Sequence, residues 1–265
     1  MVVEDKTTVL PQAPGLALTE ELRKSSKTAH GISDALVNAR ILVVFTDREL
    51  FGKAISCFMH IFSCLEELLP GALQSRKELA PFKDVLCESA LFRAEAYKQD
   101  VQFYLGPDWQ SKVTPTTEVA SYLQYLRGLR SEPLLLLTHA YTQYLAMASG
   151  GQIIARMARS QMQLPQGQGT KAFEFGPAAN ASELKVGLKS RMDGLGEVIS
   201  DNERQQILNE HLKVFSYNNS IIGSFPIGWW ASARGLVLLV PPMTRYTLLL
   251  LAVAIPAYWL AKRKD

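Results

Sequence analysis

A histidine near the N-terminus shares a predicted helix face with two basic residues. Lys27 lies three residues and Arg23 seven residues before His30, so a helix would place them one and two turns away. A neutral imidazole beside cations suits a metal ion held inside an anionic ligand. Haem is such a ligand, because its iron takes a histidine and its propionates take lysine or arginine. A solvated basic helix face is the alternative interpretation.

A pair of glycines interrupts a long apolar stretch. Gly150 and Gly151 follow Ser149, and each glycine costs about 1 kcal/mol relative to alanine inside a helix. Adjacent glycines permit a kink, or a close approach of the backbone to a flat ligand. Close packing of two helices is the alternative. Together with His30, the pair suggests a planar ligand between a histidine helix and a glycine-kinked helix.

The elements that must position these residues are predicted to be helices. Residues 47–69 have apolar side chains at helical spacing, and Pro70-Gly71 is predicted to end that helix. Thr19 is predicted to cap a first helix that starts at Glu20. Further helices are expected at about 88–105, 117–130, 133–162, 180–197 and 201–222.

The predicted fold class is therefore all-α. No stretch alternates convincingly between apolar and polar residues, which argues against strands. An irregular N-terminus, 1–18, is expected to be disordered and to precede one helical domain over 19–225. The three cysteines form no CxxC pair, so neither a disulfide scaffold nor a zinc site is indicated.

The end of the chain is predicted to be a membrane anchor. Residues 246–261 carry no charge and make about 24 Å of helix, somewhat short of a bilayer core of about 30 Å. Basic residues flank this run and can extend the span. We expect a linker or interfacial segment at 226–245, a C-terminal transmembrane helix within 246–265, and a cytosolic body at the endoplasmic reticulum membrane. The mitochondrial outer membrane is the alternative.

Charge argues against a nucleic-acid partner. The net formal charge is +3, from 28 basic and 25 acidic residues, and the segment 245–265 accounts for the whole excess. The remaining body is formally neutral, so membrane lipid is the expected partner of the basic tail.

The segment 138–152, THAYTQYLAMASGGQ, resembles the glycine-rich signature of the haem oxygenase family. The usual form of that signature is close to hAHAYTRYLGDLSGGQ. Shorter pieces that also resemble the family follow in the family's order: KTAH at 27–30, MHIFSCLEEL at 59–68, YLGPDWQ at 104–110, KSRM at 189–192 and FSYNN at 215–219.

The resemblance implies a haem-oxygenase-like multi-helix domain with haem b bound between two helices. Haem then serves as both cofactor and substrate. It would be cleaved at the α-meso carbon to biliverdin, CO and iron, with O₂ and with electrons from an NADPH-dependent reductase or a ferredoxin.

The resemblance also implies roles for single residues. His30 matches the iron ligand, and Asp34 matches the acidic residue that holds its other ring nitrogen. The residues that match propionate contacts are Arg23, Lys27, Tyr141, Lys185 and Lys189. The residues that match the catalytic side of the haem are Gly150, Asn218, Met147 and Gln143.

Four residues at three places in the sequence depart from the family on one side of the predicted pocket. Ala146-Met147 replaces the family's Gly-Asp, Gln143 replaces an arginine and Phe62 replaces a tyrosine, whereas His139 and Asn218 are retained. A thioether cannot hold the ordered water that a carboxylate holds. Two alternatives to an active enzyme follow: a haem-binding or haem-sensing homologue with weak or lost oxygenase activity, and an interaction module that no longer binds haem.

Overall fold

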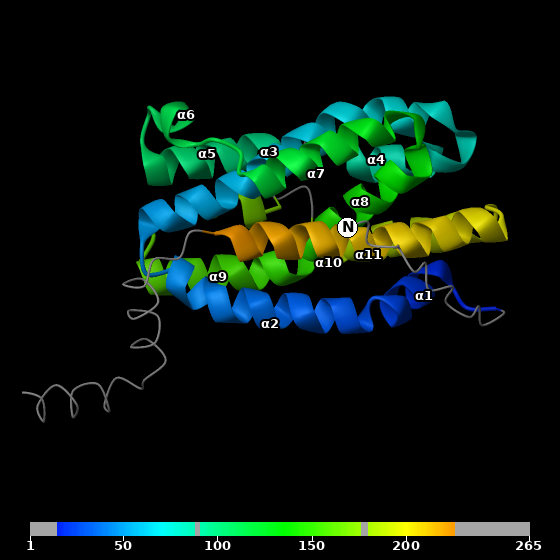
Figure 1. Cartoon of the computed structure of the whole chain (residues 1–265), viewed down its shortest axis with the longest axis horizontal. Helices are drawn as coiled ribbons and strands as arrows, with labels where there is room; N and C mark the ends of the chain where they lie inside the picture. Colours follow the sequence, from blue (N-terminus) through cyan, green and yellow to red (C-terminus); the bar gives the residue numbers. More distant parts are fainter. Residues whose placement is uncertain (1–14, 88–90, 176–179, 226–265) are drawn as a thin grey trace, which may run out of the picture.

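The computed structural model describes residues 15–87, 91–175 and 180–225, all of whose regular elements are helices (Figure 1). The predicted all-α class is therefore confirmed for these ranges. The elements are α1 (Leu18–Ser25), α2 (Lys27–Val44), α3 (Arg48–Ser75), η1 (Lys77–Phe82), α4 (Lys83–Leu86), α5 (Ala94–Leu105), α6 (Trp109–Lys112), α7 (Thr117–Gly128), η2 (Leu129–Ser131), α8 (Pro133–Ala146), η3 (Met147–Gly151), α9 (Gln152–Met162), η4 (Lys171–Phe173), α10 (Ala181–Gly196) and α11 (Asp201–Ser224).

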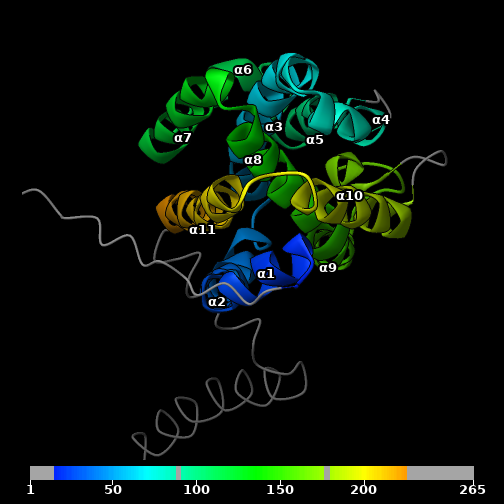
Figure 2. The same ribbon diagram turned by 90° about the vertical axis from the view of Figure 1, so that its right-hand side faces the viewer.

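Helix α8 lies at the centre of the domain (Figure 2). Helices α3, α5 and α7 lie on one side of it, and α1 and α2 lie on the other. Helix α11 packs against α2, α7 and α8, while α10 packs against α1, α8 and η3. Helix α11 thus contacts the histidine helix α2, α10 contacts the glycine-rich element η3, and both of them pack on α8.

The predicted cap at Thr19 is wrong. Helix α1 begins at Leu18 after Ala17, which makes no side-chain cap. Thr19 instead donates from its backbone N–H to Asp193 Oδ1 at 2.9 Å and from its hydroxyl to Asp193 Oδ2 at 3.1 Å. A carboxylate on α10 thus takes the hydroxyl that a cap would need, and the bonds attach α1 to α10.

The predicted helix end at Pro70-Gly71 is also wrong, because α3 continues to Ser75. Proline inside a helix costs about 3 kcal/mol. The extra turn places Ala72 and Leu73 in the core, where both are buried. Burial of these side chains offsets the missing hydrogen bond.

Two predicted helices are each divided. Residues 133–162 form α8, five π-helical residues in η3, and α9, which confirms that the glycine pair disturbs the helix. The first helix is broken at Ser26, whose hydroxyl donates to the carbonyl of Leu22 at 2.7 Å. Arg23 therefore lies on α1, whereas Lys27 and His30 lie on α2.

Some predictions fall outside the described residues. These are the linker over 226–245, the transmembrane helix within 246–265 and the first 14 of the 18 residues predicted to be disordered. Of the other four, Leu18 is the buried first residue of α1. Within the described ranges, no helix combines the length and the apolar character needed to cross a bilayer.

Candidate active site

His30 presents one free ring nitrogen on the surface of α2. Its Nδ1 lies 2.9 Å from Asp34 Oδ2, one helical turn further on. A carboxylate accepts the Nδ1 proton and thereby leaves Nε2 with its lone pair. The His30 side chain is 62% exposed, and Nε2 has no partner within the described part of the chain. The arrangement suits a nitrogen that binds a metal brought in by a ligand.

The two glycines of η3 face different surroundings. A Cβ atom built on Gly150 would meet no heavy atom within 4 Å, and Gly150 is exposed. A Cβ on Gly151 would lie 2.9 Å from Met147 Sδ and 3.2 Å from Phe173 Cδ1. Gly150 therefore borders open space, whereas Gly151 is packed against the core. A π-helical turn of this kind is rare and is frequent at functional sites.

The residues predicted to contact the propionates differ in how exposed they are and in whether they already have a hydrogen-bond partner. Lys27 and Lys189 are exposed and Lys185 is half-buried, and the two α10 lysines lie on the helix that packs against η3. Arg23 is already engaged, since it donates twice to the Glu20 carboxylate at 2.7 Å. Tyr141 is buried, and burial raises the pKa of its phenol. Their roles toward a propionate stay predictions.

Met147 and Phe62 belong to the apolar core. Met147 is buried beside Gly151. Phe62 lies between Tyr97 and Tyr144, with ring centroids 5.4 and 5.2 Å away. Both side chains are thus packed in the buried core and supply no hydrogen-bonding group there.

Gln143 and Asn218 form a pair of amides between α8 and α11. Gln143 Nε2 donates to Asn218 Oδ1 at 2.8 Å, and Asn218 Nδ2 donates back to Gln143 Oε1 at 3.5 Å. Gln143 is buried, whereas Asn218 is only partly buried. The structure therefore joins two of the predicted catalytic residues.

The amide pair is connected to a buried histidine–carboxylate pair. His139 Nε2 lies 2.7 Å from Glu210 Oε1, and its Nδ1 lies 2.7 Å from the Tyr122 hydroxyl. Burial lowers the pKa of His139. Burial opposes ionisation of Glu210, but hydrogen bonds from His139, Tyr125 and Lys213 outweigh it and lower the pKa of the carboxyl group. Both directions favour a neutral imidazole beside an ionised carboxylate, as burial beside Lys213 also does.

Sequence reasoning missed Glu210 and Tyr122. A usable signal was present, because His139 and Gln143 are polar residues one turn apart on an apolar helix. Glu210 and Asn218 are likewise eight residues apart on α11, which places them on one face. Two matched polar faces on helices that pack together predict a buried network.

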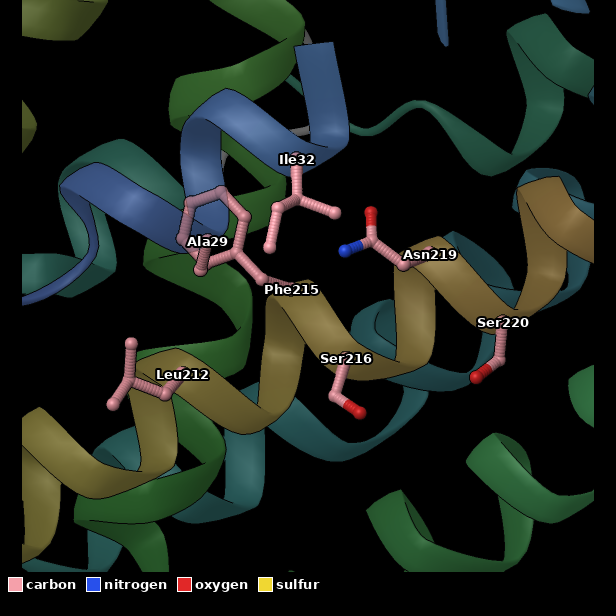
Figure 3. Close-up of a pocket in the computed structure, with 7 residues that line it drawn as sticks. All are labelled: Ala29, Ile32, Leu212, Phe215, Ser216, Asn219 and Ser220. Atoms are coloured by element: carbon pink, nitrogen blue, oxygen red, sulfur yellow. The ribbon is translucent and has the colours of Figure 1, made fainter. Parts of the chain in front are cut away.

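A pocket of about 440 Å³ lies between α2 and α11 (Figure 3). Phe215, which lines it, also has its ring centroid 5.8 Å from that of His30. Figure 3 shows Ile32, Phe215 and Asn219 turned toward one another. His30 and Gly150 are not among the lining residues, so this pocket adjoins the predicted haem position without containing it.

Comparison with known proteins agrees with this arrangement. The family model described as Heme oxygenase matches residues 16–223. Heme oxygenase 1 of Bos taurus is 32% identical over 207 residues, which cover 76% of this chain and 68% of the relative. The structure of heme oxygenase 2 from Chlamydomonas reinhardtii without heme is 42% identical, with a TM-score of 0.77, and the match covers 81% of this chain and all of that one.

A structure of heme oxygenase-2 from Synechocystis sp. PCC 6803 in complex with heme and NO is 26% identical, with a TM-score of 0.68. That match covers 78% of this chain and 84% of the other. The family model spans α1 to α11 and includes His30, the π-helical turn and the amide pair. The chain therefore belongs to the haem oxygenase family of enzymes.

Proposed function

We propose that this protein cleaves haem b to biliverdin, CO and iron, with O₂ and with electrons from an NADPH-dependent reductase or a ferredoxin. The observation that carries the proposal is the exposed His30 imidazole, whose tautomer is set by Asp34 at 2.9 Å. The heme-bound relative from Synechocystis supports haem as the ligand.

The residues on both sides of the predicted position are chemically suited to bind haem. Gly150 borders open space, so the backbone of η3 can approach a flat ring. Lys27, Lys185 and Lys189 supply positive charge for two propionates. When bound, haem supplies the iron that activates O₂. The protein then holds the ring, keeps one imidazole nitrogen toward the metal and presents the Asn218 amide.

A single-turnover experiment tests the proposal. The full-length protein is titrated with hemin and then exposed to O₂ and ascorbate, while the Soret band, biliverdin and CO are followed. We expect a Soret band that gives way to biliverdin, and loss of both in His30→Ala. His60→Gln on α3, a histidine that is not among the predicted haem contacts, is the control and keeps both. A hemin complex that yields neither biliverdin nor CO contradicts the proposal.

A second candidate is a haem-binding or haem-sensing protein with weak oxygenase activity. Met147 and Phe62 favour it, because both are buried apolar side chains where the family signature has an aspartate and a tyrosine. Met147→Asp is then expected to raise the turnover at least tenfold, whereas Met147→Leu leaves it unchanged. Turnover that is already fast in the wild type rejects this candidate.

We also propose that residues 246–265 anchor the protein to the endoplasmic reticulum membrane with the body in the cytosol. The support is the uncharged run 246–261 and its basic flanks. Leu251→Arg places a charge in this run at a cost of about 3 kcal/mol, whereas Leu251→Met does not. We expect only the arginine variant to leave the membrane fraction. Wild-type protein that alkaline carbonate extracts contradicts the anchor, and co-fractionation with mitochondria favours the outer mitochondrial membrane.

A further inference from the structure

A chain of six hydrogen-bonded side chains runs from Lys213 at the surface to the amide of Asn218. Lys213 is half exposed, and its ammonium donates to Glu210 Oε2 at 3.1 Å. Glu210 Oε1 accepts from Tyr125 at 2.8 Å and lies 2.7 Å from His139 Nε2. His139, Tyr122 and the Gln143–Asn218 amide pair continue the chain inward, and both His139 and Tyr122 are fully buried.

The chemistry of each group fixes the direction of this chain. An ionised carboxylate only accepts, so the His139 proton is on Nε2 and Nδ1 is an acceptor. The Tyr122 hydroxyl must then donate to Nδ1, which leaves its oxygen free to accept. Gln143 Nε2 lies 3.4 Å from that oxygen and donates to it.

The direction decides which end of the Gln143 amide faces which neighbour. In the flipped orientation, Gln143 Oε1 would face the Tyr122 oxygen, whose only proton goes to His139, so this contact would be unfavourable whichever way the Asn218 amide is turned. With the amide nitrogen placed there, Asn218 Oδ1 accepts and Asn218 Nδ2 uses one hydrogen on Gln143 Oε1. The second N–H of this partly buried asparagine stays free for a ligand.

The position of Asn218 makes that free N–H relevant to haem. Phe215, one turn earlier on α11, adjoins the His30 ring. Gln143 lies one turn before Met147 and two turns before Gly150. Asn218 therefore lies between the helix that carries the predicted iron ligand and the helix that leads into the glycine pair.

We propose that Glu210, His139 and Tyr122 are positioning residues that hold the Gln143–Asn218 amide pair in one orientation, with an Asn218 N–H directed to the haem. The inference rests on the proposed function. The chemistry of position 143 explains why the amide pair needs such positioning residues. A guanidinium, which the family signature has in place of Gln143, carries only donors, whereas an amide must be oriented by its neighbours.

The first test reads the histidine directly, without haem. The full-length chain has four histidines, so selective ¹⁵N-histidine labelling gives few signals, and His139→Asn assigns the one of interest. We expect His139 to be neutral with its proton on Nε2. In Tyr122→Phe, the ¹⁵N chemical shift of His139 Nδ1 is expected to move to the value of a nitrogen that accepts no hydrogen bond. A proton on Nδ1 in the wild type overturns the inference.

The second test separates positioning from binding. Tyr122→Phe is expected to leave hemin affinity within about twofold but to slow biliverdin formation about tenfold, the effect of one lost hydrogen bond. Tyr217→Phe is the matched control, since its ring stacks on Tyr122 at 4.5 Å and its hydroxyl is not part of the chain. Equal effects of the two variants overturn the inference.

A double variant gives a third readout. In Gln143→Arg the side chain has only donors, so adding Tyr122→Phe is expected to slow turnover less than it does in the wild type. Equal slowing in both backgrounds contradicts the inference. If the wild type forms no biliverdin, the proposed function fails, and the His139 spectra still decide whether the chain of hydrogen bonds has the stated direction.

Discussion

Two histidine–carboxylate pairs in this protein have almost the same length and opposite surroundings. His30 and Asp34 lie 2.9 Å apart on one helix, with side chains 62% and 61% exposed. His139 and Glu210 lie 2.7 Å apart on two different helices, with side chains 0% and 2% exposed. The exposed pair adds little to the fold and leaves a nitrogen free for a ligand. The buried pair joins α8 to α11 and has no spare group, so it serves the fold and the placement of other residues.

The largest expected effect comes from breaking the buried pair. Glu210→Ala leaves His139, Tyr125 and Lys213 without their common acceptor. Removing one partner of a buried pair lowers the free energy of unfolding by about 3–5 kcal/mol. Urea unfolding followed by circular dichroism measures the change.

The control uses a carboxylate on the surface. Glu67 pairs with Arg130 at 3.7 Å, and both side chains are exposed, so Glu67→Ala is expected to change stability by less than about 0.5 kcal/mol. If the two variants lose the same stability, burial does not distinguish the pairs and the comparison fails.

The buried region is also expected to make stability depend on pH. His211 donates from Nδ1 to the Thr142 hydroxyl at 2.8 Å, because that hydroxyl gives its own proton to the Thr138 carbonyl. Burial, with the nearby His139 and His30, lowers the pKa of His211 to about 4. The unfolded chain therefore takes up this proton first, near pH 6.5. Stability falls as the pH drops from about 6.5 to about 4, by roughly 3 kcal/mol in all.

A variant isolates this effect from the carboxyl groups that titrate in the same range. His211→Asn keeps a donor near Thr142 and removes the titration. We expect the haem-free variant to lose less stability than the wild type between pH 6.5 and 4. Parallel pH profiles of the two proteins contradict the assignment.

The contrast between the pairs also explains what the sequence could predict. The His30–Asp34 bond was implied by the resemblance, and the spacing of four residues within one helix is compatible with it. Helical periodicity located most elements to within a few residues. The Thr19 cap failed because Asp193, which is 174 residues away, takes its hydroxyl. The helix end at Pro70 failed because burial of Ala72 and Leu73 in the last turn offsets the proline penalty.

The inner part of the site was predicted only from the resemblance. Gln143 and Asn218 carry no local signal that joins them, because their contact depends on how α8 and α11 pack. Glu210 and Tyr122 were missed for the same reason. Contacts within one helix can be read from spacing, whereas contacts between helices need the tertiary structure or two matched polar faces.

A smaller effect is expected at Gly150, where function and stability oppose each other. A Cβ atom there meets nothing, so Gly150→Ala is expected to raise the free energy of unfolding by up to about 1 kcal/mol. The same methyl group occupies the space next to the predicted haem, so hemin binding weakens. Gly71→Ala is the control on α3, because its Cβ also meets nothing and hemin binding stays unchanged. Unchanged hemin binding in Gly150→Ala places the haem elsewhere.

The smallest stability effect is expected at His30, the predicted iron ligand. His30→Ala removes an exposed pair within one helix, and such pairs contribute only about 0.3–0.5 kcal/mol. Urea unfolding of haem-free protein is therefore expected to be nearly unchanged, while the same variant loses its hemin complex. A loss of more than about 1 kcal/mol without haem would mean that His30 supports the fold. The exposed His30–Asp34 pair would then resemble the buried His139–Glu210 pair in supporting the fold, and a free imidazole available to a ligand would no longer describe His30.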